Sequence, residues 1–195
     1  MIGAIVAGGL SAYTAPVTNS YESISTVTVG SGGASDVTFN LSGVSGYKHL
    51  QIRILGQTNR VTYGIDEMKL QFNSDTTGNY SWHTLVGTGS TVGVNAAASQ
   101  TSISVGEGSF GTTTGGTFGA GVLDILDYTD TSKYKTVRVL SGVDLNGTIA
   151  SYGGWVTLNS GAWRNTAAIT SIKFAPNNGT IFTQYSSFAL YGIKG

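Results

Sequence analysis

Apolar and polar residues alternate one by one in a series of short runs along this chain of 195 residues. Such alternation is typical of half-buried β-strands, whose side chains point to opposite faces in turn. No stretch keeps a helical apolar stripe for three turns, so we expect an all-β protein. The predicted core-facing residues are Val37, Phe39 and Leu41; Leu50, Ile52 and Ile54; Met68, Leu70 and Phe72; Ile103 and Val105; Val137 and Val139; Ile172 and Phe174; and a last strand over residues 188–193.

Turn-forming residues separate these runs, which predicts many short strands rather than a few long ones. Clusters of Gly, Ser and Asn occupy residues 31–33, 73–75, 111–116, 146–147 and 176–179. Eight to ten short strands in about 175 residues indicate two packed antiparallel sheets, a jelly-roll-like sandwich over residues 21–195. The Gly- and Thr-rich stretches 87–93 and 106–116 are predicted to be long loops that carry contacts.

The chain is poor in the residue types that perform most enzyme chemistry. Only 10% of its residues are charged, it has two histidines and no cysteine, and its 29 glycines suit turns. Ten basic and ten acidic residues give a net charge of zero, which argues against nucleic acid as a partner. A near-neutral surface also tends to associate, so we expect a non-enzymatic subunit of an assembly that works without a cofactor.

The first twenty residues differ from the rest, and we interpret residues 1–20 as an extended apolar arm. The first basic residue is Lys48, so the segment lacks the basic start of a secretory signal. It is also too short and too broken by glycine to span a bilayer, so no membrane partner is expected. We expect another subunit to cover the arm through Met1, Ile2, Ile5, Val6, Leu10 and Tyr13.

Neither histidine lies in a sequence pattern typical of a catalytic site. His49 lies on the polar face of a predicted strand with Gln51 and Arg53, and His83 follows Trp82. No Gly-x-Ser-x-Gly pattern accompanies them, and their separation does not fit a metal site. We therefore expect surface or hydrogen-bonded histidines.

Three groups of acidic residues are candidates for a metal or catalytic site. Asp124, Asp127 and Asp130 would not all face one side of a strand, which argues against calcium. The sequence 144–147 resembles the start of a calcium loop without its closing glutamate, so an Asn-Gly hairpin turn is preferred. Asp66 and Glu67 are the adjacent acidic pair, but neighbours on a strand point apart. No metal site is predicted.

Three tryptophans, Trp82, Trp155 and Trp163, are candidate contacts for a glycan or a protein partner. Aromatic rings stack well on sugars, yet they are equally common in the cores and interfaces of β-sandwiches. The sequence leaves both interpretations open.

Several segments together resemble a family of small virion proteins of tailed bacteriophages that infect aquatic bacteria. The resemblance runs from about residue 20 to the end and implies a non-enzymatic β-sandwich located in the virion, with no catalytic residue to assign. Its segments are SYESI (20–24), TVTVGSGGA (26–34), YKHLQIR (47–53), QFNSD (71–75), GNYS (78–81), DILDY (124–128), KYKTVR (133–138), residues 163–172 and QYSSFALYGIKG (184–195).

The resemblance fits either a capsid or a tail protein, and the sequence ranks the two. A tail fibre needs a shaft, and the chain has neither heptads nor a Gly-X-Y tract. We therefore expect a capsid decoration (cement) protein, a homotrimer that grips the major capsid protein through its arm. The alternative is a tail fibre or baseplate module that recognises host surface glycans among other tail proteins. A glycan-cleaving enzyme ranks third.

Overall fold

The computed structural model describes residues 20–114, 116–147 and 153–195, and within them the protein is all-β without a helix. No helix there could cross a membrane. The strands of the described part are β1 (Tyr21–Thr28), β2 (Val37–Asn40), β3 (His49–Thr58), β4 (Ile65–Phe72), β5 (Tyr80–Gly87), β6 (Val92–Gln100), β7 (Ile103–Thr112), β8 (Gly119–Leu126), β9 (Lys135–Asp144), β10 (Gly154–Trp163), β11 (Ser171–Pro176) and β12 (Ser187–Ile193).

These strands form one large mixed sheet in the order β2-β11-β4-β7-β3-β8-β9-β10-β5-β6, while β12 pairs with β3 and β1. The sequence predicts a wholly antiparallel arrangement. One parallel pairing breaks this rule, where Gln57 and Thr58 lie beside Gly111 and Thr112. It arises because β3 extends beyond its antiparallel partners: β8 and β12 pair with residues 49–56, and the last two residues of β3 pair with β7 instead.

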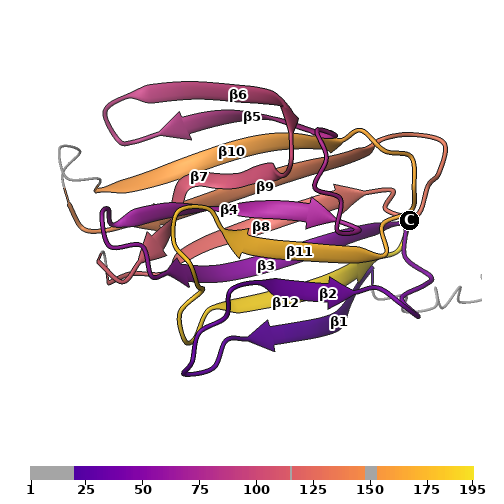
Figure 1. The fold of residues 1–195 in the computed structure, drawn as a ribbon, viewed down its shortest axis with the longest axis horizontal. Helices are drawn as coiled ribbons and strands as arrows, with labels where there is room; N and C mark the ends of the chain where they lie inside the picture. The colour runs from indigo at the N-terminus through magenta and orange to yellow at the C-terminus, as the bar shows by residue number, and fades with distance from the viewer. Residues whose placement is uncertain (1–19, 115, 148–152) are drawn as a thin grey trace, which may run out of the picture.

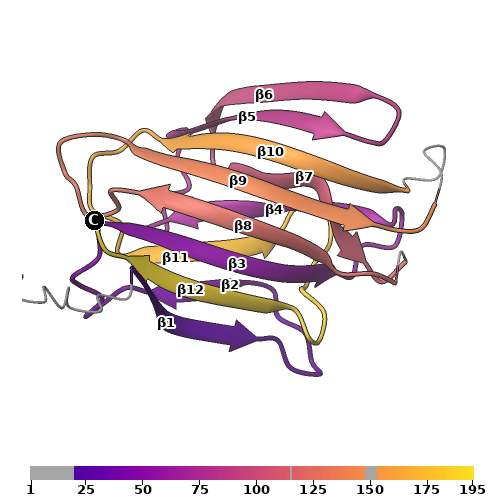
Figure 2. The same ribbon diagram turned by 180° about the vertical axis from the view of Figure 1, so that it is seen from behind.

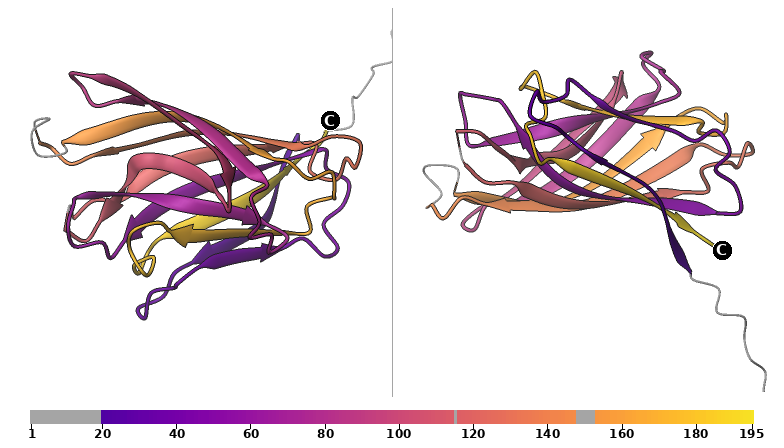
Figure 3. Two further views of the ribbon diagram at one scale, coloured as in Figure 1. Left: turned by 45° about the horizontal axis from the view of Figure 1, so that its top comes forward. Right: turned by 90° about the horizontal axis from the view of Figure 1, so that it is seen from below.

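The sheet folds over on itself. Strands β2, β11, β4 and β7 lie over the broad layer that contains β12, β3, β8, β9 and β10, as views from opposite sides and from below show (Figures 1, 2 and 3). Strand β7 packs against β9 and β10 across this space. Strand β6 pairs with β5 and forms one end of the strand order.

The apolar core lies between the two parts of the folded-over sheet, and the predicted alternation is confirmed there. All the core-facing residues predicted over residues 37–174 are buried, and Phe188 and Leu190 of β12 join them. Each of these side chains alternates with a neighbour that points out of the core, as the pleat requires. The alternation in the sequence therefore predicted the locations of these strands correctly.

Two features of the sequence interpretation are corrected. The stretch 106–116 is not a loop throughout, because β7 continues to Thr112 through a bulge rich in glycine. The connection between β9 and β10 spans residues 145–153, so Asn146 and Gly147 do not form a two-residue hairpin turn. Asn146 does adopt a positive φ of 52°, and its N–H donates to Oδ1 of Asp144 at 2.7 Å. The predicted arm lies outside the described residues, apart from Ser20.

Candidate functional site

The outward face of the broad layer carries an unusual number of exposed aliphatic side chains. Val94, Leu85, Leu158, Leu140 and Val122 stand directly opposite one another on the neighbouring strands β6, β5, β10, β9 and β8. They are between 39% and 82% exposed. A single apolar ladder therefore crosses five strands on the surface rather than in the core.

A second row beside this ladder extends the apolar surface. Val92, Val156 and Leu55 are exposed on the same side of the sheet. The residues paired with them on the neighbouring strands include the small residues Gly87, Gly142 and Ala120. These small residues do not cover the three aliphatic side chains. We call the two rows together the aliphatic face. Its members are Leu55, Leu85, Val92, Val94, Val122, Leu140, Val156 and Leu158.

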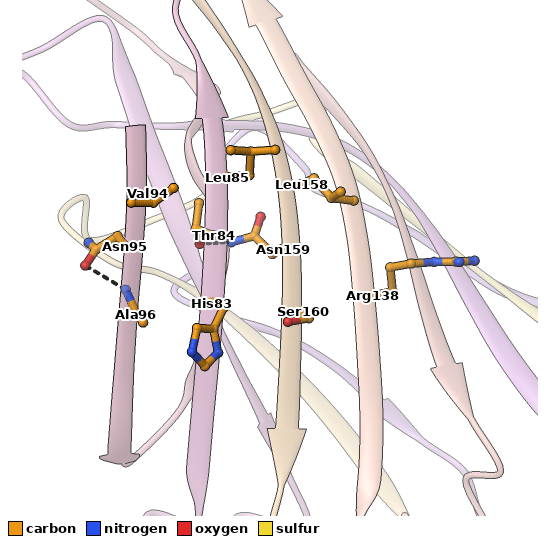
Figure 4. A pocket seen from close by; sticks show the side chains of 10 residues that line it. All are labelled: His83, Thr84, Leu85, Val94, Asn95, Ala96, Arg138, Leu158, Asn159 and Ser160. Atoms are coloured by element: carbon orange, nitrogen blue, oxygen red, sulfur yellow. Dashed lines mark hydrogen bonds between the residues drawn. The ribbon is translucent and has the colours of Figure 1, made fainter. Parts of the chain in front are cut away.

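The aliphatic face is hollowed between β6, β5, β10 and β9, where a depression of about 670 Å³ opens (Figure 4). Leu85, Leu158 and Val94 line it, with His83 and Arg138 toward one end. A smaller hollow of about 200 Å³ continues among the aliphatic side chains of β5, β9 and β10. Contiguous apolar surface of this kind commonly marks a site of protein association.

A second candidate site, of different chemistry, lies between β7 and the inward face of β5 and β10. It is a cleft of about 440 Å³ that holds Trp82, Trp155, Glu67 and Glu107, and Asn95 lies beside them. Strands β4, β5, β6, β7 and β10 each contribute one of these side chains. The fold thus gathers two tryptophans and two carboxyl groups that lie far apart in the sequence.

The cleft depends on a bulge in β7. Asp66 pairs with Phe110 and Met68 pairs with Val105, so Glu67 alone faces the four residues 106–109. Gly106 and Gly108 both adopt positive φ, 63° and 64°, a backbone conformation that favours glycine. Bulges of this kind often re-aim a side chain at a functional site, and here the residue between the two glycines is Glu107.

Strand β10 holds the bulge in place through buried polar side chains. The N–H of Gly106 donates to Oδ1 of Asn159 at 3.2 Å, and the hydroxyl of Thr157 donates to the carbonyl of Glu107 at 3.1 Å. The amide of Asn159 in turn donates to the hydroxyl of Thr84. Since Asn159 and Thr157 are almost fully buried, these bonds fix the bulge within the body of the protein.

The two carboxyl groups of the cleft differ in their surroundings. Glu67 accepts hydrogen bonds from the hydroxyl of Ser104 at 2.6 Å and from the amide of Asn177. Burial raises the pKa of Glu67, and the nearby charge of Glu107 raises it further, against the opposing effect of the Ser104 hydrogen bond. Glu67 therefore holds its proton more tightly than an ordinary glutamate.

Glu107 is incompletely paired. Its Oε1 accepts a hydrogen bond from the side chain of Asn95 at 3.2 Å. Its Oε2 is buried and has no hydrogen-bond partner among the residues that the structure describes. Buried carboxylate oxygens without a donor are costly and rare, so this atom makes the cleft a candidate binding site.

The adjacent acidic pair of the sequence separates, as expected. Asp66 is 1% exposed and accepts hydrogen bonds from the hydroxyl of Thr58 at 2.7 Å and the N–H of Gly179 at 2.9 Å. It ties the loop after β11 to β3. The partner of Glu67 in the cleft is Glu107, a pairing that sequence reasoning missed because the two lie forty residues apart and only the bulge brings them together.

Trp163 does not belong with the other two tryptophans. It is 1% exposed, its indole N–H donates to Asp75 at 2.7 Å, and its ring packs on Phe72 and Tyr80. The interpretation of Trp163 as a glycan or partner contact is therefore wrong, and it is a core residue. Trp82 and Trp155 are half-buried in the cleft and stay candidates.

The remaining polar candidates are explained by local structure. Nδ1 of His49 accepts from the N–H of Asp127 at 2.9 Å, and His83 is exposed on β5, so the predicted surface or hydrogen-bonded histidines are confirmed. Lys133 lies 2.6 Å from Asp127 and 3.3 Å from Asp130, so a lysine ammonium group already pairs with both carboxylates. Across the described ranges, no group of three or more metal-ligating side chains occurs.

Comparison with known proteins adds no relative. No family model matches the chain, and neither the curated proteins nor the solved structures contain a significant match. The aliphatic face and the cleft are therefore interpreted from their own chemistry.

Proposed function

We propose that this protein is a non-enzymatic structural subunit of a tailed-bacteriophage virion, a capsid decoration protein that works as a homotrimer on the major capsid protein. In this proposal the folded-over sheet is a jelly-roll-like sandwich and serves as a rigid module. The observation that carries the proposal is the aliphatic face. The resemblance of the segments between residues 20 and 195 to virion proteins supplies the biological setting.

The aliphatic face supports association because its burial is favourable. Removing apolar surface from water stabilises a complex by about 25 cal/mol per Å². The face includes Leu140, which is 58% exposed, and Val94, which is 82% exposed. A net charge of zero adds no long-range repulsion between copies.

A threefold assembly needs two different surfaces on each copy, because a ring is built from head-to-tail contacts. The second surface is the free edge of β6 beside the aliphatic face. The nine residues of β6 include no charged residue and no proline, and eight of them are exposed. Edge strands without such protection pair readily with another chain, so the β6 edge of one copy fits against a neighbour.

The apolar residues of the first twenty positions supply the grip on the shell in this proposal. An extended segment can add to a neighbour's sheet edge through main-chain hydrogen bonds. Several such arms per trimer multiply weak contacts into firm attachment. The residues assigned to this contact are Met1, Ile2, Ile5, Val6, Leu10 and Tyr13.

Sedimentation velocity of the purified protein tests the assembly role. We expect a species of three times 20.1 kDa for the native chain. Leu140→Lys should give monomers, because an ammonium group would be buried in the interface. The control is Val61→Lys in the loop between β3 and β4, which is 79% exposed and outside the aliphatic face. A monomeric native chain, or equal behaviour of both variants, would contradict the proposal.

The alternative, a tail module for host glycans, is favoured by one observation: Trp82 and Trp155 share a cleft with carboxyl groups. Copy number in purified particles separates the two roles. A decoration protein should approach the abundance of the major capsid protein, whereas a tail module should be a small fraction of it. Deletion of residues 1–15 should leave a folded domain that no longer attaches to particles if the arm is the grip.

A further inference from the structure

The cleft of Trp82, Trp155, Glu67 and Glu107 lies on the opposite side of β5 and β10 from the aliphatic face. Along β5, Trp82 points inward and the next residue, His83, is exposed on the outward side. A ligand in the cleft and a partner on the aliphatic face therefore do not compete. What occupies the cleft is a separate question from assembly.

The two tryptophans of the cleft come from well-separated positions along the paired strands β5 and β10. Trp82 pairs with Gly161, and Trp155 lies six residues further along the same strand β10. At about 3.3 Å per residue, their backbones are roughly 20 Å apart. One compact ligand cannot contact both rings face to face, whereas an extended chain of rings can.

Polar groups line the same cleft as the tryptophans. Glu107 and Asn95 meet there through the hydrogen bond at 3.2 Å, and Glu67 approaches from β4. Oε2 of Glu107 is a buried acceptor with no donor in the described part of the chain. A ligand that bonds to this oxygen has to bring a hydrogen-bond donor, and hydroxyl groups are such donors.

The acidic side chains that line the cleft argue against a negatively charged ligand. Asp66, Glu67 and Glu107 all line it, so an anionic ligand would be repelled. The lining cation Arg60 is already engaged, since its guanidinium donates to the carbonyl of Ile65 at 3.0 Å and stacks on the ring of Tyr63 at 4.5 Å. Among the described residues that line the cleft, no other lysine or arginine is available to bind a phosphate or carboxylate.

A small organic cation also fits poorly. An aromatic cage needs its rings within about 6 Å of the cation, and the separation of Trp82 and Trp155 prevents both from surrounding one charge. Burial raises the pKa of Glu67, so this carboxyl group takes up a proton more readily than an ordinary glutamate and offers no firm negative charge to a cation. An uncharged ligand with many hydroxyl groups matches every feature of the lining.

We propose that this cleft binds a neutral saccharide chain, with sugar rings stacked on Trp82 and Trp155 and a sugar hydroxyl donating to Oε2 of Glu107. Apolar sugar faces pack on indole rings, and the polar side chains of the cleft receive the hydroxyls. Gly108 makes room for this arrangement, because a Cβ there would clash with the indole ring of Trp155. The bulge thus serves both to aim Glu107 and to seat Trp155.

Isothermal titration calorimetry with a panel of neutral hexasaccharides tests the proposal: cellohexaose, xylohexaose, mannohexaose, maltohexaose and chitohexaose. At least one should bind the full-length protein. Trp82→Ala and Trp155→Ala should each weaken that binding at least tenfold, as loss of an aromatic anchor does. The matched control is Tyr134→Ala, which removes an aromatic ring that is 54% exposed outside the cleft.

Glu107→Gln separates ligand binding from a structural role. It should weaken saccharide binding about 10- to 100-fold, the usual effect of losing a hydrogen bond to a charged group. It should leave the melting temperature of the free protein unchanged or higher, because a buried carboxylate without a donor is removed. Binding to none of the five sugars at millimolar concentration would overturn the proposal, and so would variants that bind as tightly as the native chain.

Discussion

The core beside β10 is filled in two different ways along the length of that strand. Around Trp163, the interior is aromatic: the indole packs on Phe72 at 5.6 Å and on Tyr80 at 6.4 Å between ring centroids. Around the bulge, the interior is polar, and Ser109 shares a hydrogen bond of 2.5 Å with Ser141. The same strand, β10, contributes Trp163 to the first region and Asn159 to the second.

The aromatic region is built as a stabilising core, whereas the polar region has the features of a candidate binding site. In the aromatic region, the indole of Trp163 and the hydroxyl of Tyr80 both bond to the turn after β4. The polar region keeps a buried carboxylate oxygen of Glu107 without a donor in the described chain. Real proteins accept such a local cost mainly where function requires it.

The largest expected effect is in the aromatic region. Trp163→Ala should lower the free energy of unfolding by about 3–5 kcal/mol, the usual cost of removing a buried aromatic side chain. Urea denaturation measures it. Trp82→Ala is the matched control, because that half-buried ring lines the open cleft, and it should cost much less. Equal losses would show that the two regions contribute alike.

A smaller loss is expected at the bulge. Gly108→Ala should cost about 1–3 kcal/mol for its positive φ, and more because the new methyl group clashes with Trp155. Gly43→Ala is the control, since Gly43 has a φ of 80° and a Cβ added there would meet nothing within 4 Å. The difference between the two thermal denaturation curves isolates the clash. If they coincide, Trp155 does not depend on the bulge.

The buried amide of Asn159 should matter to a similar or lesser degree. Asn159→Ala leaves the N–H of Gly106 without its acceptor, which costs about 1–3 kcal/mol for a buried group. The neighbouring outward residue supplies the control, and Ser160→Ala should change stability by less than about 0.5 kcal/mol. Chemical denaturation of both proteins gives the comparison. A silent Asn159→Ala would mean that β10 does not fasten the bulge.

The smallest effect is a change in pH dependence. Because burial raises the pKa of Glu67, its contribution to stability is present at low pH and is lost as pH rises through the folded pKa. Glu67→Gln should therefore gain stability relative to the native chain as pH rises above the unfolded value of about 4.3.

Glu22 provides the control of opposite sign. Hydrogen bonds from Lys194 and Tyr47 lower the pKa of Glu22, so its contribution is present above the unfolded pKa and is lost as pH falls. Glu22→Gln should then lose stability relative to the native chain as pH rises toward the unfolded value of about 4.3, below the range in which Glu67→Gln gains stability. Parallel profiles for the two variants would contradict the assigned pKa shifts.

The sequence predicted the apolar core well and the two candidate sites only in part. Alternation identified Leu50, Ile52 and the other core-facing residues because burial on one face leaves a local, periodic signal. Strand β6 left no such signal, since almost all of its residues are exposed and several are Ala or Gly. The glycines of 106–108 predict a loop in error, because a bulge and a loop use the same residues.

The sites depend on long-range contacts that composition cannot reveal. Trp82 and Trp155 stand out by residue type, yet their grouping with Glu107 required the pairing of β5 with β10 and the bulge of β7. The aliphatic face could be detected in the sequence at one point. Val139 and Leu140 are adjacent and both apolar, although adjacent residues of a strand point to opposite faces of the sheet. One of the two had to be exposed or covered by a partner.

Thiol labelling measures whether another copy covers the aliphatic face, as the proposed trimer requires. The chain has no cysteine, so Leu140→Cys introduces a single reporter on the face and Val61→Cys a single reporter outside it. At assembling concentrations, we predict that a maleimide labels Val61→Cys rapidly and Leu140→Cys slowly, with the difference vanishing on dilution to monomers. Equally rapid labelling of both at every concentration would contradict the account.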